Sequence, residues 1–250
     1  MNKYTKNINR IEFVITNSCT GKCKHCSQGE HVSNEHIDTK LAVQAVHDIC
    51  NDYKIDSLMT FGGEPLLYPE TVFEIHSAAK ECGIKYRELI TNGYFSKRID
   101  RIQQVAEMLT KSGVNIIKLS VDSFHQENIP LEIVMEFAKE ILKTGVSIQT
   151  HPAWLISPND NNRFNEETKK ILAEFNKIGI EASDGNIIFA SGNALKYFGE
   201  YFNDNKEIHN PYLENKNDIK TISFSANGNV LNGNIYKNTI TDIINDYEPK

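Results

Sequence analysis

The sequence predicts an α/β protein built as a partial (β/α)6 TIM-like barrel with a small C-terminal β-hairpin appendage. Between residues 8 and 190, short runs of β-branched and aromatic residues alternate with longer amphipathic stretches. This alternation is typical of repeated βα units around a parallel sheet. Parallel strands joined through helices use right-handed crossovers, so the strands should curl into a barrel or open sheet with the helices outside. The 250 residues are enough to bury a substantial core.

Six short, mostly apolar runs are the predicted strands. Val, Ile, Thr and aromatic residues dominate them, and these residue types favour an extended backbone packed on one face. The predicted strands are residues 11–16, 57–60, 85–91, 115–121, 146–150 and 185–190.

The amphipathic stretches between the strands are the predicted helices. Pro69 opens one of them, and proline is tolerated in a first turn. Gly113, Gly145 and Gly179 each follow a last turn, where the left-handed conformation commonly ends a helix. The predicted helices are residues 39–53, 69–82, 99–112, 131–144, 166–178 and 194–202.

The C-terminal part of the chain has a different pattern. Residues 221–231 alternate in strand fashion around Asn227-Gly228, a dipeptide typical of a two-residue hairpin turn. Residues 203–220 are polar and rich in Asn, as in a surface connection. We therefore expect a core domain over residues 1–200 and a C-terminal extension over residues 201–250.

Charge and hydropathy narrow the classes of partner. The net charge is -6, from 27 basic and 33 acidic residues, and the Lys and Arg residues are scattered along the chain, so we expect no nucleic-acid partner. No apolar run approaches the roughly 20 residues that span a bilayer, and residues 1–10 lack the apolar segment of a signal peptide. We expect a cytoplasmic protein without a membrane partner.

Three of the five cysteines fall within eight residues, which favours a metal site over a disulfide framework. Cys19, Cys23 and Cys26 form a C-x3-C-x2-C cluster directly after the first predicted strand. Five scattered cysteines would give this spacing by chance in roughly one chain in 500. Thiolates select zinc or iron–sulfur clusters, and a cubane needs four ligands. Three cysteines would leave one iron open to a substrate or cofactor.

This triplet resembles the signature of the radical S-adenosylmethionine (SAM) superfamily, in which three cysteines hold a [4Fe-4S] cluster and SAM chelates the fourth iron. Other motifs extend the resemblance over residues 8–200. Gly62-Gly63-Glu64-Pro65 is similar to the GGEP motif that binds the amino group of SAM, and Thr91-Asn92-Gly93 to the TNG turn. Ser120 to Ser123, including Asp122, resembles the polar strand end near the SAM ribose. His25 stands where an aromatic residue usually lies near the adenine.

Two departures from the family pattern are visible. Gly192-Asn193-Ala194 stands where many members carry Gly-Arg-Ala, which leaves the role of this segment open. Residues 224–235 faintly resemble the start of the SPASM extension, but Asn232 and Asn234 stand where a cysteine would be sought. We therefore expect no auxiliary cluster.

Residues at the ends of the later predicted strands are candidate substrate contacts. The active sites of parallel β/α barrels lie at the C-terminal ends of the strands. Asp122 and His125 follow the fourth predicted strand, and His151 and Trp154 follow the fifth. A histidine at a strand end is more often a surface or capping residue, and Trp154 is equally consistent with plain packing. Cys50 and Cys82 lie on predicted outer helices and are interpreted as core thiols.

The resemblance implies an enzyme that takes one electron from a flavodoxin- or ferredoxin-type reductant, cleaves SAM to a 5′-deoxyadenosyl radical and abstracts hydrogen from a substrate. A ribosomal peptide or protein is the favoured substrate. A glycyl-radical activase and an enzyme for a small metabolite are the alternatives. The non-enzyme alternative is a structural zinc protein with His25 or His31 beside the three cysteines, but it leaves the GGEP segment unexplained.

Overall fold

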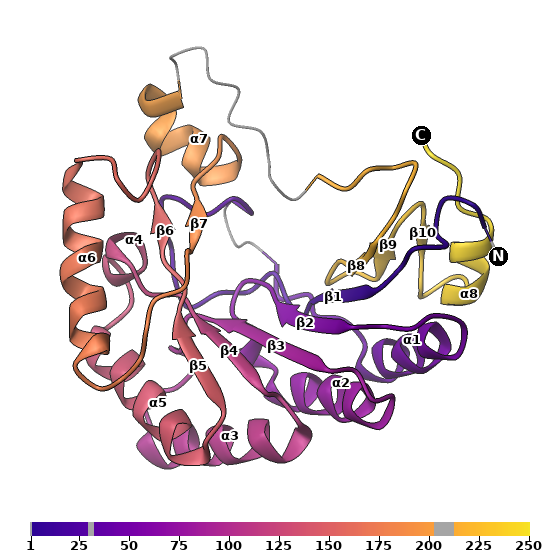
Figure 1. Ribbon diagram of the computed structural model, residues 1–250, viewed down its shortest axis with the longest axis horizontal. Coiled ribbons are helices and arrows are strands. Elements are labelled where there is room, and N and C mark those ends of the chain that lie inside the picture. The colour runs from indigo at the N-terminus through magenta and orange to yellow at the C-terminus, as the bar shows by residue number, and fades with distance from the viewer. Residues whose placement is uncertain (1, 30–32, 203–212) are drawn as a thin grey trace.

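The computed structural model describes residues 2–29, 33–202 and 213–250, and it confirms the partial barrel. Five parallel strands follow one another in chain order across the sheet (Figure 1). They are β1 (Arg10–Val14), β2 (Ser57–Phe61), β3 (Tyr86–Thr91), β4 (Ile116–Leu119) and β5 (Ser147–Thr150). All five lie where the sequence predicted strands.

Helices cover the outer face of this curved sheet (Figure 1). Two of them, α3 (Ile99–Ser112) and α5 (Leu131–Thr144), have the bounds that the sequence predicted. Gly113 and Gly145 follow them with φ of 97° and 79°, the left-handed caps expected there. The other long helices differ from the prediction by one to three residues at their ends; they are α1 (Thr39–Asp52), α2 (Pro69–Glu81) and α6 (Arg163–Asn176).

The hydrophobic core fills the space between the strands and the outer helices. On β1, Ile11 and Phe13 are fully buried toward the helices, whereas Arg10 and Glu12 alternate with them on the inner face. The inner face of the sheet is therefore polar and partly accessible. This accessible inner face borders a cavity inside the barrel.

The sixth unit departs from the main sheet. After His151 the chain continues into β6 (Ala153–Trp154), which pairs in parallel with β7 (Asn186–Ile187) in a separate two-stranded sheet. Pro152 lies between β5 and β6 and has no N–H to donate to a strand ladder. The strand predicted over residues 185–190 is thus shorter and pairs with the continuation of β5. It leads into α7 (Gly192–Phe198) and a 3-10 turn, η2 (Gly199–Phe202).

The C-terminal hairpin continues the barrel sheet on the side of β1. β8 (Thr221–Phe224) pairs in parallel with β1, and Phe224 stacks on Phe13 with ring centroids 4.5 Å apart. The predicted turn at Gly228 leads into β9 (Asn229–Val230), followed by β10 (Gly233–Asn234) and α8 (Ile240–Asn245). The domain boundary at residue 200 stays a prediction, because residues 203–212 of the expected connection lie outside the described part.

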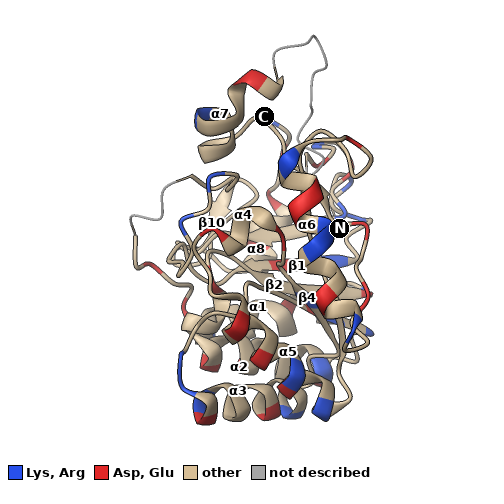
Figure 2. Ribbon diagram, turned by 90° about the vertical axis from the view of Figure 1, so that its left-hand side faces the viewer, with Lys and Arg blue, Asp and Glu red and all other residues tan. Residues whose placement is uncertain are grey.

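Surface charge is mixed on the outer helices. Lys and Arg residues alternate with Asp and Glu residues along α3, α5 and α6 (Figure 2). Across the described ranges, no helix combines the length and apolar character needed to cross a membrane.

Candidate active site

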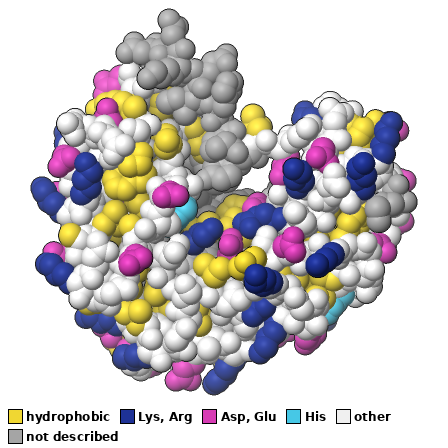
Figure 3. Space-filling view, in the orientation of Figure 1, with side chains coloured by type: hydrophobic (Ala, Val, Ile, Leu, Met, Phe, Trp, Pro, Cys, Tyr) yellow, Lys and Arg dark blue, Asp and Glu magenta, His cyan; other side chains and the backbone are white. Residues whose placement is uncertain are grey.

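A cavity of about 580 Å³ lies on the inner side of the barrel, at the C-terminal ends of the strands. Figure 3 shows this face of the molecule hollowed between the part that holds α6 and the part that holds α8. Most of the predicted site residues line the cavity: Cys19, Cys23, His25, Cys26, Gly62, Gly63, Thr91, Asn92, Ser120, His125 and His151. The predicted residues Glu64, Asp122 and Trp154 are buried and are not among the lining residues.

The three cysteines of the motif lie on one loop after β1. Cys19 Sγ accepts hydrogen bonds from the Gly21 N–H at 3.3 Å and the Asn92 amide at 3.5 Å. Burial raises the pKa of the Cys19 thiol to about 12, and burial together with Asp122 and the other two cysteines raises the pKa of Cys23 still further. The thiols are thus close enough to oppose one another's ionisation. A bound metal centre would favour the thiolate forms, because the metal takes the place of the thiol protons.

Asn193 holds the cysteine loop from the far side of the cavity. Its backbone N–H donates to the Cys26 carbonyl at 2.9 Å, and its side-chain amide donates to the Cys23 carbonyl at 3.2 Å. Gly192 packs so closely that a Cβ there would lie 2.5 Å from the Ser27 carbonyl oxygen. From the sequence alone the role of this segment stayed open; its contacts anchor the loop that carries the three cysteines.

We expect Asn193→Ala to loosen this loop without removing a thiol. The variant loses the side-chain bond to Cys23, about 1 kcal/mol for a neutral hydrogen bond and more if the buried carbonyl stays unpaired. Iron loaded into the variant should be lost to a chelator several times faster than from the wild type, as followed by absorbance. Asn176→Ala, at an exposed position at the end of α6, is the matched control. Equal rates of iron loss in all three proteins would contradict the anchoring role.

The diglycine segment after β2 packs against the residues that precede Cys19. The Gly63 N–H donates to the Thr16 carbonyl and the Glu64 N–H to the Ser18 carbonyl, both at 2.8 Å. A Cβ at Gly63 would lie 2.1 Å from the Ser18 oxygen, and Gly62 has a φ of 150°. Only glycine allows these two backbone segments to approach so closely.

Glu64 is fully buried and ties the diglycine segment to the turn after β3. Its carboxylate accepts hydrogen bonds from the Thr91 hydroxyl at 2.7 Å, the Asn92 N–H at 2.8 Å and the Leu66 N–H at 2.9 Å. Burial raises the pKa of Glu64 to about 7, although these three donors favour the charged form. The carboxylate therefore links two of the predicted SAM motifs; a direct contact of Glu64 with SAM stays a prediction.

Glu64→Gln should destabilise the fold. In glutamine an NH2 group replaces one of the two carboxylate oxygens. This NH2 group would face an N–H or O–H donor that has lost its acceptor, which should lower the free energy of unfolding by about 2–3 kcal/mol. Thermal or denaturant unfolding of the purified protein measures this loss. Glu107 is exposed and forms an ion pair with Lys111. Glu107→Gln should therefore change the free energy of unfolding by less than about 0.5 kcal/mol. Equal stability of the two variants would contradict the linking role of Glu64.

Asp122 and His125 form a hydrogen-bonded pair beside the cysteine loop, in which Asp122 is fully buried and the His125 side chain is 17% exposed. Asp122 begins α4 (Ser123–Gln126), and its carboxylate accepts bonds from three backbone N–H groups and from His125 Nδ1 at 2.8 Å. Burial opposes both charges. The pairing nevertheless lowers the pKa of Asp122 and raises the pKa of His125. Asp122 thus orients the His125 ring toward the cavity.

His25 lies between this pair and the cysteines. Its ring centroid is 4.6 Å from that of His125 and 5.1 Å from that of Phe124. Burial, reinforced by His125, lowers the pKa of His25 to about 3, and its Nδ1 has no partner among the described residues. Coordinating atoms of His25, Asp122 and His125 lie within 4.8 Å of one another. Four donors already occupy the Asp122 carboxylate, so a hydrogen-bonded arrangement fits these residues better than a metal site.

Trp154 and the two helical cysteines lie away from the cavity surface. Trp154 packs in the core, and its indole N–H donates to the Asp184 carbonyl at 2.9 Å. Cys50 and Cys82 pack against the core from α1 and next to α2, and Cys82 Sγ lies 3.5 Å from His47 Nδ1. Their positions fit the packing interpretation of all three residues.

The donor set fits an iron–sulfur cluster with SAM beside it. Three thiols on one loop face the same cavity as Gly62 and Gly63, and the missing side chains of these glycines let their backbone pack against residues 16–18, which lead into Cys19. The unpartnered Nδ1 of His25 is a buried polar atom in that wall. Of the two further zinc ligands considered from the sequence, His31 lies outside the described residues.

Comparison with known proteins gives one family. The model of the radical SAM superfamily matches residues 13–151, more than half of the chain. Among curated relatives, a GTP 3′,8-cyclase of Alkaliphilus oremlandii is 26% identical over 154 residues, which are 58% of this chain and 46% of the relative. A GTP 3′,8-cyclase of Desulforamulus reducens is 26% identical over 51% of this chain and 38% of its own length. The chain therefore spans less than half the length of these relatives.

Solved structures share the fold at low identity. The structure of anSMEcpe with bound AdoMet has a TM-score of 0.63 and 15% identity, covering 97% of this chain and 81% of that chain. Streptococcus suis SuiB bound to S-adenosylmethionine has a TM-score of 0.63 and 14% identity, covering 98% of this chain and 67% of that chain.

Proposed function

Since the chain belongs to the radical SAM superfamily, we propose that it cleaves SAM reductively and abstracts hydrogen from a substrate held in the barrel cavity. The superfamily uses a [4Fe-4S] cluster and SAM as cofactors, which together supply a 5′-deoxyadenosyl radical when an external flavodoxin- or ferredoxin-type protein provides one electron. One observation carries the proposal: the three motif cysteines and the diglycine segment line the same cavity.

The residues of this chain have distinct tasks in this proposal. Cys19, Cys23 and Cys26 would hold the cluster, on a loop anchored by Asn193. Gly62 and Gly63 would receive the methionyl part of SAM on exposed backbone, and His25 would pack near its adenine. Thr91, Asn92 and Ser120 line the wall between them and are proposed SAM contacts. Glu64 and Asp122 are proposed contacts as well, from their buried positions behind this wall.

A peptide or protein segment is the first candidate substrate. Two structural neighbours were solved with peptides: anSMEcpe with a Cp18Cys peptide and SuiB with its precursor peptide SuiA. His125 and His151 are the proposed substrate contacts that line the cavity, and Trp154 is a weaker candidate because it packs in the core. The open side of the cavity in Figure 3 is compatible with an extended substrate.

A small metabolite is the second candidate, because the matching curated relatives are GTP 3′,8-cyclases. Anaerobically reconstituted protein with SAM and dithionite would be incubated with GTP in one reaction and with peptides encoded by neighbouring genes in another. We expect 5′-deoxyadenosine in both and a mass change in a peptide only. Conversion of GTP without peptide modification would overturn the peptide assignment, and the absence of 5′-deoxyadenosine would overturn the proposed function.

A further inference from the structure

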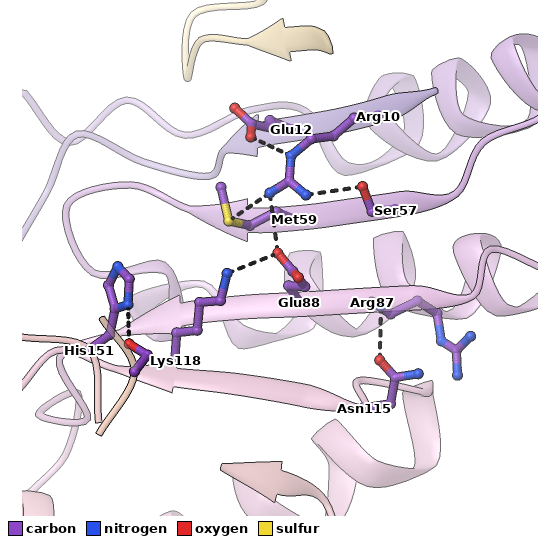
Figure 4. Close-up of polar contacts among 10 residues, drawn as sticks. Arg10, Glu12, Ser57, Met59, Arg87, Glu88, Asn115, Lys118 and His151 are labelled. Atoms are coloured by element: carbon purple, nitrogen blue, oxygen red, sulfur yellow. Dashed lines mark hydrogen bonds and ion pairs between the residues drawn. The ribbon is translucent and has the colours of Figure 1, made fainter. Parts of the chain in front are cut away.

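The inner face of the barrel carries a row of paired charges that runs across its strands (Figure 4). Arg10 on β1 donates to Glu12 at 2.7 Å and reaches across β2 to Glu88 on β3 at 3.2 Å. Lys118 on β4 donates to the same Glu88 oxygen at 3.4 Å. Glu88 thus fixes the Lys118 ammonium on the inner face, next to the end of β5.

His151 directly follows β5 beside this fixed ammonium, and the position of its ring proton follows from its neighbours. Its Nδ1 lies 2.8 Å from the Ser183 Oγ. The Ser183 hydroxyl donates its own proton to the Thr150 carbonyl at 3.1 Å and accepts from the Gly185 N–H at 3.3 Å. With one proton on its hydroxyl, Ser183 satisfies all three contacts only if that proton goes to Thr150 and His151 Nδ1 carries the proton of the bond between them.

The second ring nitrogen of His151 is therefore a hydrogen-bond acceptor. Figure 4 shows it turned away from the bond at Nδ1, and His151 lines the cavity. Burial and the charge of Lys118 lower the pKa of His151, which favours the uncharged ring, although a side-chain hydrogen bond with Asn186 and the charge of Asp122 act in the opposite direction. A neutral imidazole locked in one tautomer presents a lone pair in a defined direction.

We propose that His151 recognises the substrate through Nε2, which accepts a hydrogen bond from a hydroxyl or amine of the substrate, and that Ser183 is the positioning residue that sets this role. The inference rests on the proposed function only in taking the cavity as the substrate site. It assigns the substrate a hydrogen-bond donor at the β5 side of the cavity, beside Asn186.

The tautomer can be read directly from nitrogen NMR of the reconstituted protein labelled with 15N-histidine, with His151 assigned by the loss of its signal in His151→Gln. At pH 7 we expect the neutral tautomer with the proton on Nδ1. Ser183→Ala should shift the population toward the other tautomer, and Ser183→Thr, which restores a hydroxyl, should recover it. A proton on Nε2 or a charged ring in the wild type would overturn the inference.

The donor requirement can be tested with two small probes in the SAM-loaded protein. Ethanolamine offers hydroxyl and ammonium donors, whereas acetate of similar size offers acceptors only. Ethanolamine should move the Nε2 resonance saturably, with an apparent affinity at least threefold weaker in Ser183→Ala; acetate should leave it in place. A response to acetate, or none to ethanolamine, would overturn the inference. Assay of 5′-deoxyadenosine on the same samples tests the proposed function separately, because the His151 tautomer does not depend on SAM cleavage.

Discussion

Cys23→Ala should yield a protein that folds but binds little iron and forms 5′-deoxyadenosine only at background level. Cys23 is the most buried cysteine of the motif, and its loss leaves two thiolates where an open cubane needs three. Removing a residue that only contacts a metal ligand lowers metal affinity or activity roughly 10–100-fold. Removing a ligand itself should therefore lower iron binding and 5′-deoxyadenosine formation by more than about 100-fold. Iron analysis and quantified 5′-deoxyadenosine measure both effects.

Cys50→Ala is the matched control for this prediction. Cys50 lies on α1, on the outer side of the sheet, and packs against the core. This variant should keep its iron and its SAM cleavage within about twofold, with at most a small loss of stability. A full iron content in Cys23→Ala, or an equal loss of iron in Cys50→Ala, would contradict the assignment of the cluster ligands.

Gly63→Ala should lower SAM cleavage by about 100-fold, the scale expected when catalytic groups are misplaced by about 1 Å. The new methyl group would lie 2.1 Å from the Ser18 carbonyl oxygen and 2.6 Å from the Ser18 carbonyl carbon. Both contacts are with backbone, so the segment that leads into Cys19 or the diglycine segment itself must move. The rate of 5′-deoxyadenosine formation at saturating SAM, together with the affinity for SAM, measures the consequence.

Gly199→Ala separates this steric effect from the general effect of adding a methyl group. Among the described residues, nothing lies within 4 Å of a Cβ at Gly199, and its φ of -53° suits any residue. The control should behave as the wild type. If Gly63→Ala also kept the wild-type rate and SAM affinity, the close approach of the two backbone segments would have no functional importance.

The elements that the sequence predicted best are those with strong local signals. The bounds of α3 and α5 were predicted correctly because each helix has an amphipathic pattern and a glycine cap. Most of the site residues that were predicted from the cysteine spacing and the neighbouring motifs likewise line one cavity. Local pattern was sufficient wherever a residue's role depends on its immediate neighbours in the chain.

The features that the sequence did not predict depend on contacts between distant residues. The pairing of β8 with β1 joins residues about 210 positions apart, and no periodicity encodes it. The pairing of β6 with β7 in a separate sheet likewise joins residues about 33 positions apart. Asn193 and Ser183 contact residues far away in the chain. The family pattern marked the segment of Asn193 without giving it a role, and Ser183 has no signal beyond its own polar side chain.

Formation of 5′-deoxyadenosine by the anaerobically reconstituted wild-type protein, with SAM and dithionite, is the most direct test of the central claim. We predict a brown protein with about four irons per chain, and 5′-deoxyadenosine and methionine in equal amounts. A colourless protein that carries stoichiometric zinc and leaves SAM intact would contradict it.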